Sequence, residues 1–281
     1  MTLHMESRKT STEVRPMILD SWDAHKQHGE AGDVWLVVLA GGRGTRLQQF
    51  IRHITGSGRP KQFCRIVGTR SMLRHTWDRA RRIVPPDRIV TVVTAGQESY
   101  LDDEASGTVP RGVLVQPANK ETVPGLLLPL LWIAERDPSV TVVVFPSDHF
   151  IWEEERFLGY VRAAVRASRH FANRVVVLGV EADGPEQSYG WIAPGPPCEA
   201  DVGAELYHFS RTLLAEQPES LLALPVRAVY WSDWGDPQRI LRTLRRFDRR
   251  PAWLPAYARA LAQGAELAPG DIDSACSETA A

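Results

Sequence analysis

The chain is poor in cysteine, has almost no net charge and lacks any long hydrophobic run. Its three cysteines, Cys64, Cys198 and Cys276, are odd in number and far apart, which argues against a disulfide framework and against a C-x-x-C metal pair. A net charge of −1 over 281 residues offers no basic field for nucleic acid. No apolar stretch approaches the roughly 18 to 20 residues of a membrane span. These absences predict a soluble, cytoplasmic protein with reduced thiols that binds neither nucleic acid nor membrane.

The two ends of the chain differ in composition from its middle. Residues 1–32 are polar and aperiodic and lack the apolar core of a secretory signal, so we expect a flexible N-terminal arm. From about Pro251 the sequence is rich in alanine and proline and then becomes polar, and residues 249–281 are expected to form a loosely attached tail. Residues 33–248 are left as the folded domain, and a chain that is 43% hydrophobic can bury a substantial core.

Short β-branched runs alternate with amphipathic stretches throughout this middle part. The continuous apolar character of the runs indicates strands buried on both faces, as in a parallel sheet. The predicted strands are residues 34–40, 89–94, 113–116, 140–146 and 174–180. The predicted helices are residues 71–83, 123–136, which Pro129 should kink or interrupt, and 153–171. The alternation predicts an α/β fold in which ligands bind beyond the carboxyl ends of the strands.

The first predicted strand ends in the glycine-rich stretch "GGRGTR". Residues without a Cβ let backbone N–H groups approach an anion closely, although most glycine turns are merely turns. The pattern G-x-x-x-x-G-K-[ST] is absent, and G-x-G-x-x-G, begun at Gly42, fails at Leu47. The loop carries its own cations, Arg43 and Arg46, and Lys61 follows in "GRPKQF". This combination favours phosphate binding over an ordinary turn.

The segments "LAGGRGTRL" and "RPKQF" resemble the signature of the sugar-1-phosphate nucleotidyltransferases, and the second is similar to the mannose-1-phosphate guanylyltransferase branch. The resemblance implies a three-layer α/β/α, Rossmann-like fold with a mixed, mainly parallel sheet. It also implies catalytic roles for Arg46 and Lys61, with Lys61 neutralising developing charge. The loop residues that would contact the nucleotide are Ala40, Gly41, Gly42, Gly44, Thr45 and Arg46.

Two aspartates follow short apolar stretches far apart in the chain. Asp148 lies in "VVVFPSDHF" and Asp233 in "VYWSDWGDP". Taken alone, the first would be read as a capping or turn residue. The family carries metal-binding aspartates in similar Pro-x-Asp-His and Trp-x-Asp-x-Gly settings, so the resemblance implies that Asp148 and Asp233 bind Mg²⁺ and that Asp148 is catalytic. His149 is interpreted as a structural neighbour, and Asp183 and Asp236 as surface or capping residues.

Two further segments resemble substrate-binding parts of the family. "QPANKETVPG" is similar to the nucleotide-base pocket, although without the resemblance an ordinary capped loop would be the favoured interpretation. The implied base-pocket residues are Gln116, Pro117, Asn119 and Thr122. "PEQSYGWI" is similar to the sugar-binding segment and implies that Tyr189 and Gly190 lie beside the sugar.

The pattern breaks after Ile192, where the family continues into a Glu-Lys-Pro strand. Here residues 193–204 contain the proline- and glycine-rich "APGPPCEADVG" instead, so the domain is interrupted. Losing an interior strand should leave sheet edges and apolar faces uncovered. Losing the lysine should leave the acceptor phosphate, with about two negative charges, poorly held.

Three hypotheses therefore remain. The first is an enzyme that joins GTP and mannose 1-phosphate, giving GDP-mannose and pyrophosphate. The second is a nucleotide-binding or regulatory protein without the sugar-phosphate site, and the third is an unstable relic of a deletion. The sequence leaves the base, the sugar and the oligomeric state open, and it is compatible with a homo-oligomer.

Overall fold

The computed structural model of the protein describes residues 34–104, 110, 112–119, 122–182, 184, 189, 192–197, 205–208 and 220–263. The predicted arm at residues 1–32 lies outside these residues. So do 198–204 of the predicted interruption and 264–281 of the predicted tail.

The first sheet is wholly parallel and has the strand order β3-β2-β1-β4. Its strands are β1 (Val34–Leu39), β2 (Ile89–Thr94), β3 (Gly112–Gln116) and β4 (Thr141–Pro146). The registers Leu39↔Val92 and Leu39↔Pro146 bring the carboxyl ends of β1, β2 and β4 to one edge of the sheet. The predicted strands in this part of the chain are confirmed, and the apolar runs in β1 and β2 are buried on both faces.

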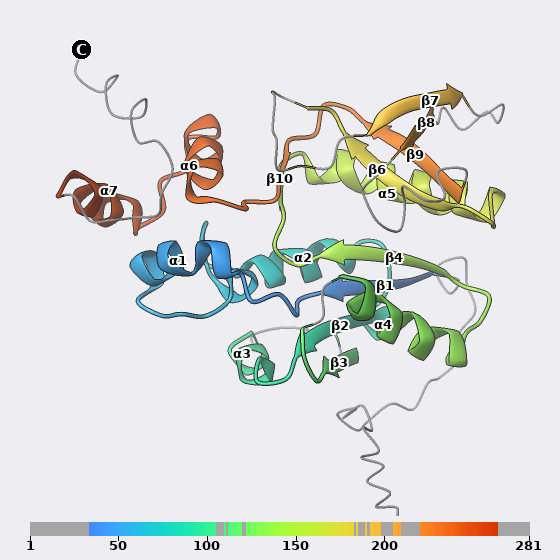
Figure 1. The fold of residues 1–281 in the computed structure, drawn as a ribbon, viewed down its shortest axis with the longest axis horizontal. Coiled ribbons are helices and arrows are strands. Elements are labelled where there is room, and N and C mark those ends of the chain that lie inside the picture. The colour runs from blue at the N-terminus through green and yellow to red at the C-terminus, as the bar shows by residue number, and fades with distance from the viewer. Residues whose placement is uncertain are drawn as a thin grey trace, which may run out of the picture.

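Helices cover both faces of this sheet. The main ones are α2 (Met72–Ala80), α4 (Thr122–Arg136) and α5 (Glu154–His170). Alternate side chains of β1 point to opposite faces: Trp35 packs against α4, with its ring 5.6 Å from that of Trp132, whereas Leu36 belongs to the core that contains Trp77 of α2. The result is the predicted three-layer α/β/α arrangement (Figure 1). Helix α4 continues through Pro129, so the proline does not interrupt it.

A second sheet has the strand order β6-β9-β8-β7. Its strands are β6 (Val175–Val180), β7 (Ala193–Pro197), β8 (Glu205–His208) and β9 (Leu221–Val226). β6 and β9 are parallel, and β8 is antiparallel to both β7 and β9. The strands are thus mixed and mainly parallel, as expected, but they are divided between two sheets. No described strand joins β4 to β6.

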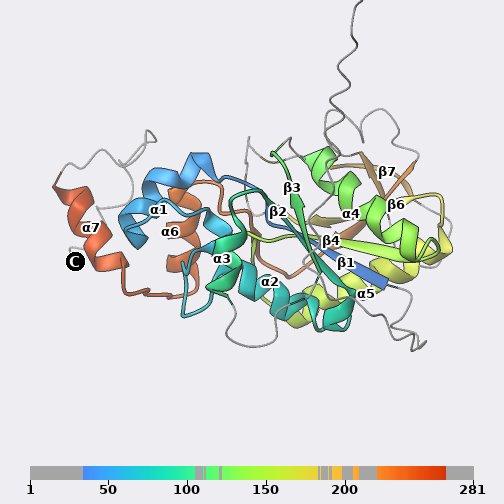
Figure 2. The ribbon, with the colours of Figure 1, turned by 90° about the horizontal axis from the view of Figure 1, so that it is seen from below.

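Short elements and three helices complete the described structure. The short ones are η2 (Thr45–Leu47), η3 (Lys61–Phe63), η4 (Pro86–Arg88), α3 (Glu98–Asp102) and the antiparallel pair β5 (Phe150–Ile151) and β10 (Trp231–Ser232). Helices α1 (Gln48–Thr55), α6 (Pro237–Arg246) and α7 (Leu254–Ala262) gather beyond the carboxyl ends of the first sheet's strands (Figure 2). In the described part of the chain, no helix has both the length and the apolarity that crossing a bilayer requires.

Helix α7 lies within the expected loose tail, but it is attached to the domain. Tyr257 is 5% exposed and its ring lies 5.1 Å from that of Phe50 in α1. The ring of Trp253 also meets that of Phe50 edge to face, with centroids 5.5 Å apart, and its indole N–H donates to the Ile66 carbonyl. The interpretation of this segment as loosely attached was wrong. Although the segment is rich in alanine, its aromatic residues Trp253 and Tyr257 pack against α1.

Candidate active site

The glycine loop lies at the carboxyl edge of the first sheet, directly after β1. The Thr94 hydroxyl donates to the Gly41 carbonyl at 2.8 Å. A Cβ on Gly41 would lie 2.5 Å from Nε2 of Gln116 and 2.9 Å from Oγ1 of Thr94, so a larger residue would have to displace them. Gly44 has φ +61°, a conformation that favours glycine. The loop is thus tied down at Gly41, while residues 42–46 remain exposed.

Two glutamines that were not predicted from the sequence bind the glycine loop through hydrogen bonds to its carbonyl groups. Nε2 of Gln62 donates to the carbonyls of Ala40 at 2.6 Å and Gly42 at 2.8 Å. Nε2 of Gln97 donates to the same Gly42 carbonyl at 3.2 Å. These bonds satisfy the carbonyl oxygens of Ala40 and Gly42 within the protein. Gln62 was detectable as the neighbour of Lys61 in "RPKQF", whereas Gln97 had no sequence signal.

Lys61 contacts both predicted metal-binding aspartates. Its side chain is 5% exposed, and Nζ lies 2.9 Å from Oδ2 of Asp148. Nζ also donates to the carbonyls of Asp233 at 2.5 Å and Trp234 at 3.2 Å. Asp148 follows β4 and Asp233 follows β10, so two segments far apart in the sequence meet at one ammonium group. The structure therefore brings Lys61, Asp148 and Asp233 together.

The Asp233 carboxylate is held by three donors. Its Oδ1 accepts from Nη1 of Arg239 at 2.7 Å, from the Gly235 N–H at 2.9 Å and from the Tyr189 hydroxyl at 3.1 Å. Burial raises the pKa of Asp233, but the hydrogen bonds from Arg239 and Gly235 outweigh it and keep the pKa below its ordinary value. The carboxylate therefore stays ionised near neutral pH. Arg239, which the sequence analysis missed, also lies over the Tyr189 ring at 4.4 Å.

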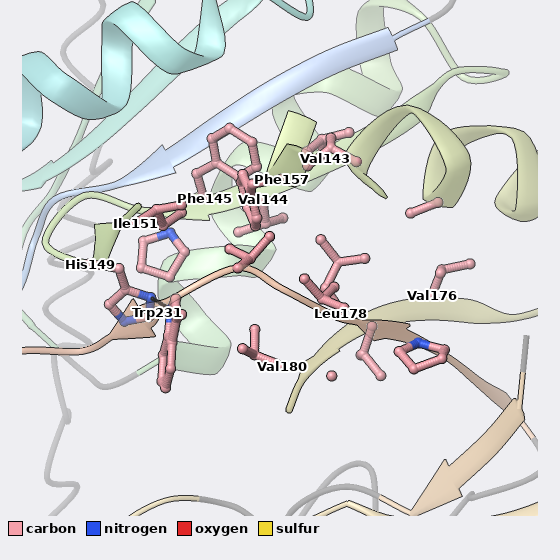
Figure 3. A pocket seen from close by; sticks show the side chains of 18 of the residues that line it. Val143, Val144, Phe145, His149, Ile151, Phe157, Val176, Leu178, Val180 and Trp231 are labelled. Atoms are coloured by element: carbon pink, nitrogen blue, oxygen red, sulfur yellow. Dashed lines mark hydrogen bonds between the residues drawn. The ribbon is translucent and has the colours of Figure 1, made fainter. Parts of the chain in front are cut away.

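His149 packs beside this cluster, as the sequence-based interpretation of a structural neighbour expected. Its Nδ1 accepts from the Trp231 indole N–H at 3.1 Å, and the two rings meet edge to face at 5.1 Å (Figure 3). Burial lowers the pKa of His149, and Lys61 adds to this effect, whereas the Asp148 and Asp233 carboxylates oppose it. The ring is therefore neutral at pH 7 and can accept this hydrogen bond.

The predicted base-pocket residues lie at the same sheet edge, in different environments. Gln116 is 7% exposed, and its Nε2 donates to Oγ1 of Thr94 at 2.8 Å beneath the glycine loop. Pro117 and Asn119 follow β3 and are exposed. Thr122 is the first residue of α4. Of the predicted sugar-side residues, Gly190 lies outside the described part of the chain.

The donor set at Lys61 suits a metal ion that arrives with phosphate ligands. No group of three or more histidine, cysteine, aspartate or glutamate side chains among the described residues can hold a metal ion alone. Mg²⁺ commonly takes only one or two carboxylates and completes its shell with phosphate oxygens and water. Asp148, whose side chain is 37% exposed, and Asp233 provide that number. The number of carboxylates is therefore compatible with a Mg²⁺ ion that brings phosphate ligands of its own.

Comparisons with known proteins identify the family of the chain. The family model of the nucleotidyl transferases matches residues 36–205. The chain belongs to this family. The resemblance seen in the sequence is thereby confirmed at the level of the family. The chain is 28% identical over 245 residues to the xanthan biosynthesis protein XanB of Xanthomonas campestris, covering 86% of this chain and 49% of XanB.

Two further comparisons extend this picture. A mannose-1-phosphate guanylyltransferase of Salmonella montevideo is 27% identical over 162 residues, which covers 57% of this chain and 32% of that protein. The chain thus spans about half or less of the length of these relatives. The crystal structure of mannose-1-phosphate geranyltransferase from Thermus thermophilus superposes with a TM-score of 0.60 at 20% identity, covering 74% of this chain and 79% of that one. This likeness supports the fold.

Proposed function

We propose that this protein transfers a nucleotidyl group from a nucleoside triphosphate to a sugar 1-phosphate. The observation that carries the proposal is the convergence of the exposed glycine loop, Lys61, Asp148 and Asp233 at one sheet edge in a nucleotidyl transferase. The relatives named as mannose-1-phosphate guanylyltransferases favour GTP and mannose 1-phosphate as the substrates. The products would be GDP-mannose and pyrophosphate.

The chemistry needs positioning and charge neutralisation more than proton transfer. An oxygen of the sugar phosphate would attack the α-phosphorus in line, and the bond from that phosphorus to the bridging oxygen of pyrophosphate would break. The attacking phosphate is already ionised near neutral pH, so no general base is required. Arg46 and the loop N–H groups would bind the triphosphate, and Lys61 would neutralise charge that develops at the α-phosphate.

Asp148 and Asp233 would hold Mg²⁺ when the triphosphate is bound. Bound there, the ion would supply electrostatic stabilisation of the phosphate oxygens. Arg239 would keep Asp233 ionised and oriented for this role, because it donates to the carboxylate from a buried position. Lys61 would hold Asp148 in the same way through the 2.9 Å ion pair.

The direct experiment follows pyrophosphate release from GTP, Mg²⁺ and mannose 1-phosphate, with other nucleoside triphosphates and sugar phosphates as a panel. We expect release that requires Mg²⁺ and falls at least about 100-fold in Asp148→Asn. The matched control is Asp87→Asn, because Asp87 lies in η4 between α2 and β2 and has no place in the cluster. No release with any pair in the panel would refute the enzyme, and full turnover by Asp148→Asn would refute the metal assignment.

The missing Glu-Lys-Pro segment favours a second candidate function, a nucleotide-binding protein without turnover. This candidate keeps the donor side and has lost the cation that would hold the acceptor phosphate. It predicts that calorimetry detects GTP binding, that Lys61→Ala weakens the binding, and that mannose 1-phosphate does not bind. Absence of GTP binding would exclude this candidate, and measurable binding of mannose 1-phosphate would favour the enzyme.

A further inference from the structure

A long groove separates the two sheets of the protein. Its volume is about 1840 Å³. One wall is β4, the other is β6, and α5 lines it as well (Figure 3). The side chains that line its middle are Val143, Val144, Phe145, Val176, Leu178 and Val180. One end of the groove reaches His149 and Trp231 of the candidate active site.

Both walls of the groove are sheet edges. β4 is the last strand of the first sheet and β6 is the last strand of the second. No described strand pairs with the outer side of either one. The arrowheads of β4 and β6 point toward the same end of the molecule in Figure 1, so the two edges run side by side in the same direction. Such edges present rows of backbone N–H and C=O groups that need hydrogen-bond partners.

Helix α5 spans the two sheets as a single layer. Phe157 and Val161 near its start pack with Phe145 of β4, and Ala167 near its end packs with Leu222 and Leu224 of β9. The edges of β4 and β6 therefore face each other across the groove, and α5 covers both. They are arranged like two strands of a single sheet that lacks the strand between them.

The chemistry of the groove selects the kind of occupant. The walls at its middle are aliphatic, although arginines such as Arg156 and Arg174 also line the groove, and Val144 and Val175 are exposed by 37% and 56%. An apolar small molecule would cover these side chains but would leave the backbone groups of both edges without partners. A polypeptide in the extended conformation supplies both apolar side chains and backbone donors and acceptors. A β-strand is thus the occupant that satisfies the whole surface.

We propose that residues 17–22 of this same chain occupy the groove as a strand antiparallel to β4 and β6. The segment reads "MILDSW" and matches the six residues of each edge in length. Pro16, which has no N–H to donate, would stand just before the strand, a position that proline tolerates. Four of the six residues are apolar or aromatic, whereas the rest of residues 1–33 is mostly polar.

The connection to β1 permits this placement. Residues 1–33 precede Val34, and Val34 is in register with Thr141 of β4. A strand in the groove would lie two strand spacings from β1, roughly 10 Å away. Residues 23–33 can span roughly 36 Å when extended, so they can cross β4 and leave slack. Covalent attachment also gives the segment an effective concentration in the millimolar range, which a separate partner would have to exceed.

Hydrogen exchange measured by mass spectrometry tests the proposal without using transferase activity. The samples are the full chain, a chain lacking residues 1–30, Leu19→Asp, and the matched control Leu3→Asp from the same arm. We expect peptides that cover β4 and β6 to exchange at least about tenfold more slowly in the full chain and in Leu3→Asp than in the other two. Peptides from β1 and β2 serve as the control for an intact fold. A synthetic peptide of residues 14–24, added to the shortened chain, should restore the slow exchange.

Each other outcome overturns the proposal. Equal exchange in the full and shortened chains means that the arm does not fill the groove. Slow exchange that survives the deletion and depends on protein concentration means that a second copy fills it instead. Fast exchange at β1 in the shortened chain would mean that this chain does not fold, and the Leu19→Asp variant then gives the answer. Slow exchange at β4 in Leu19→Asp contradicts the proposal. Because the assay contains no substrate, its result does not depend on whether the protein has the proposed transferase activity.

Discussion

Nζ of Lys61 lies 2.9 Å from the Asp148 carboxylate and 2.5 Å from the Asp233 carbonyl oxygen. The lysine is therefore the point where the loop after β4 and the loop after β10 are joined. Its ammonium group is surrounded by acceptors from these two loops, including the Trp234 carbonyl at 3.2 Å. Removing it should affect both the arrangement of the site and the stability of the junction.

We predict that Lys61→Met lowers the rate of pyrophosphate release by about 100-fold or more, because the positive charge near the reacting phosphate is lost. The free energy of unfolding should also fall, by about 1 to 3 kcal/mol, since the Asp233 and Trp234 carbonyls lose a buried donor. Urea denaturation measures the second effect. Arg65→Met, at an exposed position shortly after η3, is the control and should change neither quantity. An unchanged rate would remove Lys61 from the mechanism.

We predict that Arg239→Met shifts the acid limb of the pH–rate profile to higher pH. Burial alone raises the pKa of Asp233, and Arg239 supplies the largest opposing effect, so its loss leaves the carboxyl easier to protonate. Arg239→Lys should rescue only part of the shift, because an ammonium cannot reproduce the contacts of the planar guanidinium with Asp233, Asp236 and the Tyr189 ring. Arg242→Met, on an exposed position of α6, should leave the profile in place.

We predict that alanine substitution has different effects on stability at two adjacent glycines. Gly41→Ala should lower the free energy of unfolding by about 1 to 3 kcal/mol, because its Cβ would stand 2.5 Å from Nε2 of Gln116. Gly42→Ala should leave the unfolding free energy almost unchanged, because no atom lies within 4 Å of its Cβ. Urea melts of the two variants give the comparison directly. Equal stabilities would mean that the close packing at Gly41 relaxes without cost.

We predict that acid destabilises the fold through His149. Its pKa is lowered in the folded state, so between its ordinary value near 6.5 and the lower folded value the unfolded chain binds more protons. The free energy of unfolding should therefore fall as the pH drops below about 6.5, by up to about 1.4 kcal/mol per pH unit for this group. His75 has a lowered pKa as well and contributes with the same sign. His149→Gln should flatten the dependence and leave the part due to His75, and an identical slope in this variant would contradict the prediction.

The sequence predicted the first sheet and its covering helices well, because local patterns determined them. The apolar runs of β1 and β2 and the serine N-cap of α2, where Ser71 accepts from the Arg74 N–H, are all visible in short windows. The grouping of Lys61 with Asp148 and Asp233 was also predicted, but only through the family resemblance. Spacing alone could not bring together residues separated by 172 positions.

The parts that the sequence did not predict depend on tertiary contacts. Gln62 and Gln97 support the glycine loop through side-chain bonds to carbonyls, which leave no periodic pattern. Arg239 is one of several arginines in α6, and only the fold shows that it, unlike Arg242, faces Asp233. The burial of α7 likewise depends on aromatic contacts with α1 across the whole chain.

The division of the strands into two sheets has a consequence for cooperativity. The first sheet is stabilised on both faces by large buried side chains such as Leu36 and Trp77, whereas the separate cluster that the end of α5 forms with β9 has, among the described residues, only Ala167, Leu222 and Leu224 as buried members. Local opening requires less free energy where fewer apolar contacts are lost. The β6–β9 region should therefore open first while the nucleotide side stays folded. Unfolding should then occur in two steps, and the less stable region is the one beside the groove.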